Sequence, residues 1–596
     1  MCAPRTSVSR SFPGTDPGAE FPAAWSTRGA DSLPPHSPSA SHPPFPLRPP
    51  SMSTRSTPSP SDLPPLSTEI DPRPADAATG DLPPEDFRVQ AHAAVDWMAD
   101  YLAGVEHYPV LARVRPGDLK AALPASAPEE AEDMAHVLQD FEDLIVPGIT
   151  HWNHPSFHGY FAVTGSAPGI LGEMLASTLN INAMVWRSSP AGTELEEHVL
   201  GWIRAFLGLP EDYFGVIQDT ASSSSLVALA AARQRAYPEV RETGLSGLPR
   251  GRIYASREAH SSIEKAGITL GFGLEGVRKI PVDDVFRMDP EALRSAIEED
   301  LAEGIRPVAV VATVGTTSTT SPDPVRAIAR VARDHGLWLH VDAAYAGAAA
   351  SVPELRPLFA GWEEADSIVF NPHKWLFTPM DCSILYTRHP GTVKQAFSLV
   401  PEYLVTPEQG ESINLMDYGV ALGRRFRALK LWFVMRAFGT EGIRERIREH
   451  VRLARDLAAQ VEEGEGWELV APVPFATVVF RRTSPSLLPE DQDALNMALM
   501  HAVNDTGEVF LSHTRLNGRI ALRLSIGNLR TEARHLARSW ELLQEGARRL
   551  EQELDSAGDV TEHGAVGSPG SPVSIPSPGS PSPVPPSPIS TSSKPA

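Results

Sequence analysis

Short apolar runs alternate with capped helical segments between residues 151 and 400. The helical segments Leu293–Glu303 and Val325–His335 each follow an Asp or Ser that can cap them. Runs this apolar predict buried, parallel-type strands, and the alternation predicts an α/β fold with a mostly parallel sheet between helices. In such sheets, ligands bind beyond the carboxyl ends of the strands. The predicted strands are residues 252–256, 307–313, 337–342, 367–370 and 382–386.

The distribution of proline separates this region from two tails. Of 57 prolines, 20 lie in residues 1–84 and 10 in residues 568–596. Sequence rich in Pro and Ser buries too little apolar surface to offset the entropy of ordering it. Residues 1–84 and 556–596 are therefore predicted to be disordered.

Apolar spacing predicts further domains on both sides of the α/β region. Stripes at residues 87–105 and 134–145 predict an N-terminal helical segment, residues 85–150, that must bury its apolar face somewhere. Residues 401–555 predict a smaller α+β domain. Its predicted helices are residues 424–438, 440–463 and 530–553, and its predicted strands are residues 475–482 and 519–526.

Charge and cysteine content limit the partners and the compartment. The chain has 52 Lys and Arg against 74 Asp and Glu, a net charge of −22, which argues against nucleic acid or an anionic membrane as partner. Cys2 and Cys382 are its two cysteines and form no disulfide framework. No apolar stretch approaches the about 20 residues that cross a bilayer. These features predict a soluble cytoplasmic protein.

Residues with distinct chemistry follow the predicted strands. Asp342 ends one strand, the segment Asn371–Lys374 follows another, and His260 and Thr317 follow two more. A hydroxyl-rich run, Thr220–Ser225, opens an apolar helix. Each group alone is more often a solvated loop charge, a structural histidine or an ordinary helix cap. Their ordered combination at one sheet edge favours a functional site.

The combination fits a pyridoxal 5'-phosphate site. Apolar surroundings lower the pKa of Lys374, which makes its amine a nucleophile for a carbonyl. A buried Asp342 can hold a positively charged ring nitrogen, and His260 offers a flat ring for stacking. The N–H groups of a helix N-terminus bind phosphate. These are the roles that a protein supplies to this cofactor.

The segments Asn371–Leu376 and His340–Gly347 resemble signatures of group II pyridoxal-phosphate-dependent decarboxylases, in particular the aromatic-L-amino-acid decarboxylases. The resemblance spans about residues 85–550 and includes Tyr108–Leu111, Pro147–Trp152 and Gly423–Arg427. It implies a fold type I, aspartate-aminotransferase-like homodimer. Residues 85–150 would pack on the partner subunit, residues 151–400 would form the large cofactor domain, and residues 401–555 would form the catalytic loop and small domain.

The resemblance also implies roles for single residues. Lys374 would form the Schiff base with the cofactor, Asp342 would pair with its ring nitrogen, and His260 and Ala344 would lie on opposite ring faces. Ser223-Ser224 replaces the Glu-Ala pair usual in the family, which puts side-chain contacts beneath that turn in doubt. The other residues expected to contact the cofactor are Thr220, Ala221, Ser222, Thr317, Asn371 and His373.

Product and substrate depend on further positions. Tyr403 matches the family's loop tyrosine, which is proposed to return a proton to the substrate carbon, so its presence favours an amine product. The positions that match the family's side-chain pocket are altered at Ala162, Asn182 and Met184, so an aromatic substrate is an inference from the family. That pocket is predicted to comprise Trp152, Tyr160, Phe161, Asn182 and Met184.

The main hypothesis is therefore a pyridoxal-phosphate-dependent decarboxylase that converts an L-amino acid, expected to be aromatic, to its amine and carbon dioxide. Four alternatives remain at this point. They are an aromatic aldehyde synthase, a decarboxylase for a non-aromatic amino acid, an aminotransferase of the same fold, and a non-catalytic scaffold that uses the proline-rich tails.

Overall fold

The computed structural model describes residues 81–399, 412–485 and 487–562. The predictions made for residues 1–80 and 563–596, and for Tyr403 in the segment 400–411, lie outside the described residues. Within the described ranges, no helix is both long and apolar enough to span a membrane.

Seven strands of the described residues form the central sheet, in the order β1-β7-β6-β5-β4-β2-β3. Neighbours from β6 to β3 run parallel, as predicted. The prediction of a parallel-type strand at residues 382–386 is wrong, because β7 is antiparallel to both β1 and β6. No helix lies between β6 and β7, whereas the crossover that joins neighbouring parallel strands is usually a helix. The strands are β1 Phe214–Gln218, β2 Gly251–Ser256, β3 Val277–Ile280, β4 Arg306–Thr313, β5 Trp338–Asp342, β6 Ser367–Phe370 and β7 Ser383–Thr387.

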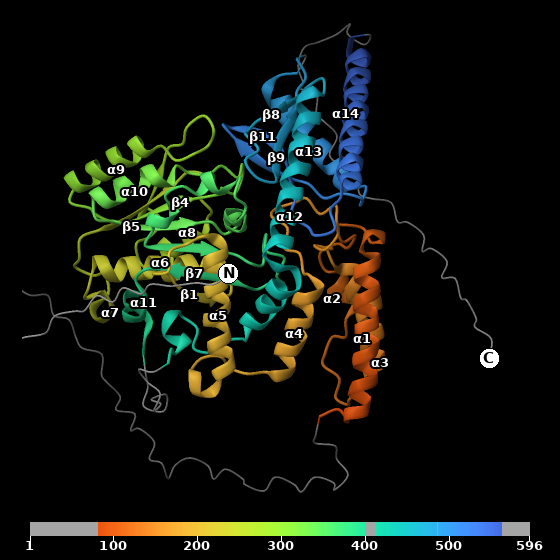
Figure 1. The fold of residues 1–596 in the computed structure, drawn as a ribbon. Helices are drawn as coiled ribbons and strands as arrows, with labels where there is room; N and C mark the ends of the chain where they lie inside the picture. The colour runs from red at the N-terminus through yellow and green to blue at the C-terminus, as the bar shows by residue number, and fades with distance from the viewer. Residues whose placement is uncertain (1–80, 400–411, 486, 563–596) are drawn as a thin grey trace, which may run out of the picture. The chain divides into compact units, whose positions relative to one another are not determined.

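Helices cover both faces of this sheet (Figure 1). Alternate residues of β4 point to opposite faces, so Val310 and Ala312 contribute to one core and Ala309 and Val311 to the other. The first face packs against α5 (Pro190–Leu207), α9 (Pro290–Ala302) and α10 (Val325–Asp334). The second packs against α6 (Ala221–Ala236), α8 (Ser262–Thr269) and α11 (Pro390–Phe397).

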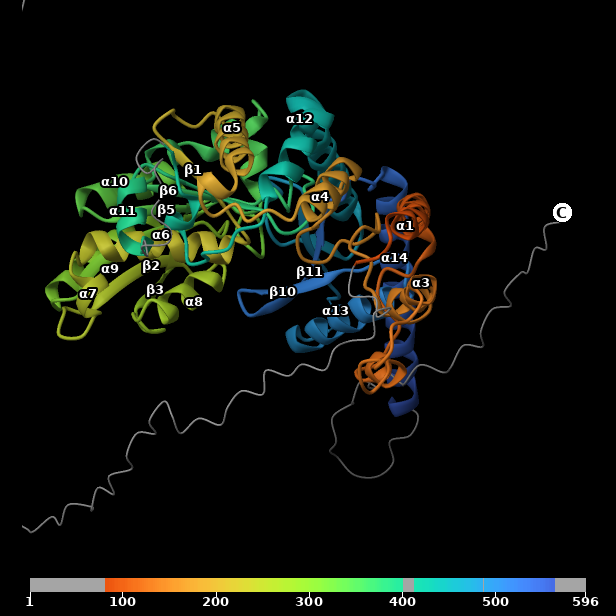
Figure 2. The ribbon, with the colours of Figure 1, turned by 90° about the horizontal axis from the view of Figure 1, so that it is seen from below.

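A second, antiparallel sheet has the order β10-β11-β9-β8. Figure 2 shows β10 and β11 beside α13. The long helix α12 is broken at Gly439, whose φ of 63° and ψ of 166° are not helical, at the boundary between the two predicted helices. The elements are α12 Arg427–Glu463, β8 Trp467–Leu469, β9 Thr477–Arg482, α13 Pro489–Asn504, β10 Ser512–Leu516, β11 Arg519–Ser525 and α14 Ala533–Glu562.

An extended segment that contains His158 joins this second sheet. The N–H of His158 donates to the Phe510 carbonyl at 2.9 Å, and the N–H of Ser525 donates to the His158 carbonyl at 2.9 Å. Phe157 and Phe510 also form a parallel bridge. The segment that begins the predicted large domain therefore hydrogen-bonds to the small sheet.

The N-terminal helices leave apolar surface exposed. Helix α1 (Pro84–Gly104) has no buried side chain, although its Trp97 packs edge-on against Phe141, with 4.9 Å between ring centroids, just after α3 (Met134–Asp140). Helix α4 (Ala167–Leu179) packs its Gly172 against the backbone of α12 and exposes another face. That face presents Leu171, Leu175 and Leu179, which are 48–59% exposed.

Candidate active site

A cavity of about 410 Å³ lies at the carboxyl ends of β2, β4, β5 and β6. The rule that ligands bind beyond parallel strand ends predicts this place. All ten residues expected to contact the cofactor line it. They are Thr220, Ala221, Ser222, His260, Thr317, Asp342, Ala344, Asn371, His373 and Lys374.

Lys374 is held in a turn directly after β6. Its backbone N–H donates to the Asn371 carbonyl at 3.0 Å, and the residue is half-buried at the cavity. Burial lowers the pKa of the Lys374 amine, Arg523 lowers it further, and Asp342 acts in the opposite direction. A larger fraction of this amine is therefore neutral and nucleophilic than for an exposed lysine.

Asp342 is the last residue of β5, a strand whose five residues are all buried between β4 and β6. Its side chain is 5% exposed, and its Oδ1 accepts the N–H of Ala344 at 3.0 Å. This bond fixes the carboxylate beside the small Ala344, where a flat ring can lie. The electrostatic effect of Asp342 reaches both Lys374 and His260.

His260 follows β2, and its tautomer is set by Ser262. The Ser262 N–H donates to Nδ1 of His260 at 3.1 Å, and the Ser262 hydroxyl lies 2.9 Å from the same nitrogen. Nδ1 is therefore an acceptor, and neutral His260 carries its proton on Nε2. Burial lowers the pKa of His260, and Lys374 lowers it further against the opposing effect of Asp342. A neutral, oriented imidazole results.

The N-terminus of α6 provides an anion site at one end of the cavity. Its N-cap residue, Thr220, makes no side-chain capping bond, and both Ala221 and Ser222 line the cavity. Free N–H groups in the first turn of a helix, together with its dipole, bind phosphate.

Asn371 and His373 add a donor at the same cavity. Burial lowers the pKa of His373 to about 4, so the ring is neutral, and its Nδ1 accepts the Cys382 N–H at 3.0 Å. The ring proton is then on Nε2, which lies 3.3 Å from the Asn371 atom assigned as Nδ2, and this proton requires an oxygen acceptor. The amide oxygen of Asn371 therefore faces His373, because the opposite orientation leaves that oxygen buried without a partner. Its NH₂ group is left to donate to a ligand.

Ser224, one of the two serines that depart from the family pattern, belongs with Ser225 to a buried hydroxyl network. The Ser224 hydroxyl lies 2.8 Å from that of Ser383, and the Ser225 hydroxyl lies 3.1 Å from Nε2 of His340. These contacts tie the first turn of α6 to β7 and β5. The turn is therefore held from below by neutral hydrogen bonds.

The predicted substrate residues are only partly brought together. Trp152, Tyr160 and Phe161 line the cavity, and Trp152 stacks on Tyr160 with 5.9 Å between ring centroids. Ala162 is buried outside the lining, close to Gly527. Asn182 and Met184 also lie outside it: the Asn182 Oδ1 accepts the Arg424 N–H at 2.9 Å, and its Nδ2 lies 3.4 Å from the Met184 sulfur.

Sequence reasoning missed the residues that the second sheet contributes. Arg523 of β11 lines the cavity, donates to the carbonyls of Ser318 and Tyr160, and has its Cζ 4.5 Å from the centre of the Phe161 ring. The Thr514 hydroxyl of β10 lies 2.8 Å from that of Ser318. One signal in the sequence was available, because Arg523 is a charge inside the otherwise apolar run Ile520–Leu524 of β11.

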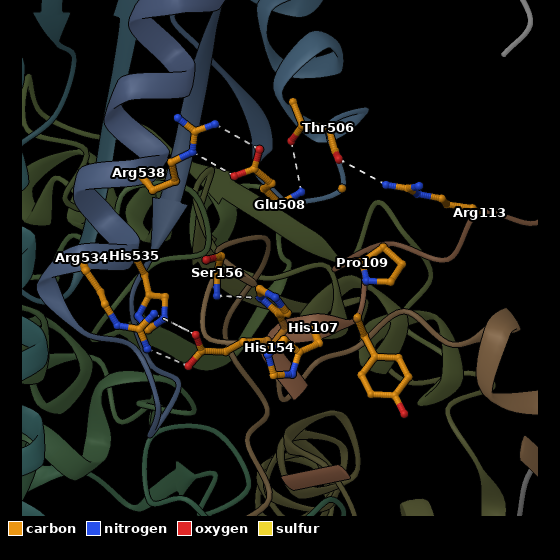
Figure 3. A pocket seen from close by; sticks show the side chains of 13 residues that line it. His107, Pro109, Arg113, His154, Ser156, Thr506, Glu508, Arg534, His535 and Arg538 are labelled. Atoms are coloured by element: carbon orange, nitrogen blue, oxygen red, sulfur yellow. Dashed lines mark hydrogen bonds and ion pairs between the residues drawn. The ribbon is translucent and has the colours of Figure 1, made fainter. Parts of the chain in front are cut away.

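A second, open pocket of about 470 Å³ lies between the N-terminal segment and the start of α14 (Figure 3). Its carboxylates are neutralised, since Glu106 accepts two bonds of 2.8 Å from Arg534, and Glu508 pairs with Arg538 at 2.9 and 3.1 Å. No lysine is among the described residues that line this pocket. Of these two pockets, the cavity lined by Lys374 is therefore the one that can supply a lysine amine as a nucleophile.

Comparison with known proteins agrees with this geometry. The family model of the pyridoxal-dependent decarboxylase conserved domain matches residues 116–483. The chain belongs to this family. Its cofactor is accordingly pyridoxal phosphate, and the protein is a carboxy-lyase. The free N–H groups of α6 and the NH₂ group of Asn371 suit the phosphate, and Lys374 and Asp342 suit the aldehyde and the ring nitrogen.

Relatives of this decarboxylase cover most of its length. Tyrosine decarboxylase 4 of Petroselinum crispum is 40% identical over 80% of this chain and 96% of its own. Phenylacetaldehyde synthase of a Rosa hybrid cultivar is 37% identical over 79% of this chain and 95% of its own. The crystal structure of Catharanthus roseus tryptophan decarboxylase in complex with L-tryptophan is 37% identical, has a TM-score of 0.75, and covers 79% of this chain and all of that one. The fold type I architecture is thereby confirmed.

Proposed function

We propose that this decarboxylase converts an aromatic L-amino acid to the corresponding amine and carbon dioxide. The observation that carries the proposal is one cavity that joins Lys374 to an aromatic wall of Trp152, Tyr160 and Phe161. Aromatic surfaces favour burial of a substrate ring. The relatives named for tyrosine and the structure that holds L-tryptophan support the same substrate class.

Different residues of the cavity are proposed to bind the cofactor, to attract the substrate and to donate a proton. Pyridoxal phosphate, when bound, supplies the electron sink for the bond between Cα and the carboxylate. Lys374 offers a neutral amine, Asp342 stabilises a proton on the ring nitrogen, and His260 stacks with a fixed tautomer. Arg523 has no acidic partner among the described contacts and attracts an amino-acid carboxylate to the cavity. Tyr403 remains the proposed donor of the final proton, on the basis of its sequence.

A panel of the twenty amino acids with DOPA and 5-hydroxytryptophan tests the proposal, with carbon dioxide, amine and hydrogen peroxide measured together. We expect stoichiometric amine and carbon dioxide from Phe, Tyr, Trp or DOPA, and no turnover with Lys374→Ala. That variant should also lose the visible absorbance of the lysine-bound cofactor. Turnover confined to acidic or aliphatic amino acids would contradict the aromatic substrate class.

An aldehyde synthase is the second candidate, because relatives at 37% and 34% identity carry that name. Such a reaction consumes oxygen and releases hydrogen peroxide and ammonia with the aldehyde. We expect the wild-type protein to release amine, and Tyr403→Phe to shift the product toward the aldehyde. Amine output that is unchanged in Tyr403→Phe would remove this tyrosine from the mechanism.

We also propose that the enzyme is a cytoplasmic homodimer. The exposed leucines of α4 and the exposed Phe87, Val89 and Val95 of α1 support a second copy as the partner of the N-terminal helices. The low cysteine content and the net charge of −22 support a reducing compartment and argue against nucleic acid as a partner.

A further inference from the structure

Three parallel rings form a stack from the cavity wall into the protein core, and a fourth ring lies edge to edge with the deepest of the three. The Phe161 ring lies 3.9 Å from that of Tyr345 at 15°, and Tyr345 lies 5.0 Å from Trp375 at 3°. Trp375 lies 6.4 Å from His450 at 4°. These four residues, here called the aromatic column, come from distant parts of the chain, so the column connects the segment before α4 with β5, β6 and α12.

The deep end of the column is fixed by hydrogen bonds. The indole N–H of Trp375 donates to Nδ1 of His450 at 2.9 Å, so neutral His450 carries its proton on Nε2. Nε2 then donates to the Asn528 carbonyl at 3.1 Å. Burial lowers the pKa of His450 to about 4, which keeps the ring neutral near pH 7. Trp375 is therefore held in one orientation.

The outer end of the column contacts the reactive lysine. Nζ of Lys374 lies 5.2 Å from the centre of the Phe161 ring, and the Arg523 guanidinium makes a cation–π contact with the same ring. Lys374 also directly precedes Trp375 in the chain. Lys374 is therefore linked to the column twice: it is the chain neighbour of Trp375, and its side chain packs near the Phe161 ring. Tyr345, 3% exposed, fills the space between these two rings.

We propose that Tyr345 is a positioning residue for Lys374: its ring, stacked on the fixed Trp375, holds Phe161 in the plane that packs against the lysine amine. The aromatic ring of Tyr345, rather than its hydroxyl, carries this role, because Phe161 and Trp375 stack on its two faces. Without it, Phe161 has a choice of rotamers, water reaches the amine, and the distance between Lys374 and Arg523 is no longer set. The proposal rests on the cofactor chemistry of the family and is independent of which amino acid is the substrate.

Titration of the visible absorbance of the lysine-bound cofactor, without substrate, tests this. Tyr345→Leu removes the flat ring, and we expect the pH midpoint of the absorbance change to rise by about 0.5 or more, because the lysine nitrogen becomes more hydrated. We expect kcat to fall about tenfold or more, with a smaller change in KM. Tyr345→Phe keeps the stack, so it should leave the pH midpoint unshifted and kcat within about threefold of wild type.

Two further variants separate positioning from loss of packing. Phe161→Leu acts at the half-buried outer end and should reproduce the spectral shift even if Tyr345→Leu fails to fold. Phe480→Leu is the matched control, since Phe480 is 0% exposed and its ring packs on Trp467 and Trp540, away from the column. It should lower the melting temperature without moving the midpoint. An unmoved midpoint in folded Tyr345→Leu or Phe161→Leu would overturn the proposal, as would an equal shift in Phe480→Leu.

Discussion

At the scale of single residues, neighbouring hydrogen bonds determine which end of the buried Asn371 amide faces the cavity. Its oxygen serves the Nε2 proton of His373, whose own orientation comes from the Cys382 N–H. The NH₂ group is then the part of Asn371 that is available to the cofactor phosphate. A chain of two hydrogen bonds thus orients this side chain so that its NH₂ group can donate to a phosphate, which remains a prediction.

Asn371→Asp tests this orientation. The change replaces a donor by a carboxylate that repels phosphate, so we expect the dissociation constant of pyridoxal phosphate to rise about 10- to 100-fold. Quenching of the apoprotein's tryptophan fluorescence by added cofactor measures it. Asn517→Asp, the same change in the exposed β10–β11 turn, should leave the constant within about twofold. Equal affinity in Asn371→Asp would show that the amide does not face the phosphate.

The residues that sequence reasoning could place share one property: they follow a strand whose apolar run is easily read. Lys374, Asp342 and His260 are of this kind. Arg523 could not be placed in the cavity, because about 150 residues separate it from Lys374 and only the packing of two sheets brings them together. Asn182 and Met184 lie outside the cavity, since their loop packs beside Arg424.

At the scale of elements, the sequence predicts long and strongly patterned segments best. The helix break at Gly439 and the strands β4, β5 and β6 lie within a residue or two of their predictions. The strands β1 and β3 were missed, because they are short and only half of their residues or fewer are fully buried. Whether two strands pair parallel or antiparallel depends on the segment that connects them, and an apolar run does not reveal that segment's path. For this reason β7 was predicted as parallel although it is antiparallel.

Helix α4 offers a test of the proposed dimer. Leu175 is 48% exposed on the apolar face of α4, and a charge there would have to be buried in the contact between copies. We expect Leu175→Glu to shift the enzyme from dimer to monomer in light scattering coupled to size-exclusion chromatography. Leu301→Glu on α9, where the leucine is 49% exposed, should stay dimeric. A dimer that survives Leu175→Glu would exclude this face as the interface.

At the scale of the whole molecule, buried neutral histidines make stability depend on pH. Burial lowers the pKa of four of them to about 4 and that of His158 to about 3. The unfolded chain therefore binds more protons than the folded one between about pH 6.5 and 4, and stability falls as the pH falls through that window. Asp323, whose pKa burial raises to about 7, acts in the opposite direction and offsets part of the loss. The other three histidines at about 4, besides His450, are His154, His340 and His373.

Urea unfolding of the holoenzyme at pH 7 and pH 5 measures this effect. We expect a lower midpoint at pH 5, because each histidine contributes up to about 2 kcal/mol over this interval. Asp323→Asn removes the opposing group and should enlarge the difference between the two pH values. A midpoint that is equal or higher at pH 5 would contradict the linkage.

The segment that carries Trp152, Tyr160 and Phe161 hydrogen-bonds to the small sheet, whereas Lys374, Asp342 and His260 stand on the large one. The side chains proposed for recognition and those proposed for reaction thus belong to different sheets, which share one apolar core and meet at the cavity. Substitutions of Trp152 or Tyr160, which lie outside the aromatic column, can alter which amino acid is accepted while Lys374 and Asp342 stay in place. One scaffold can in this way acquire new substrates in small steps and keep the same bond cleavage throughout.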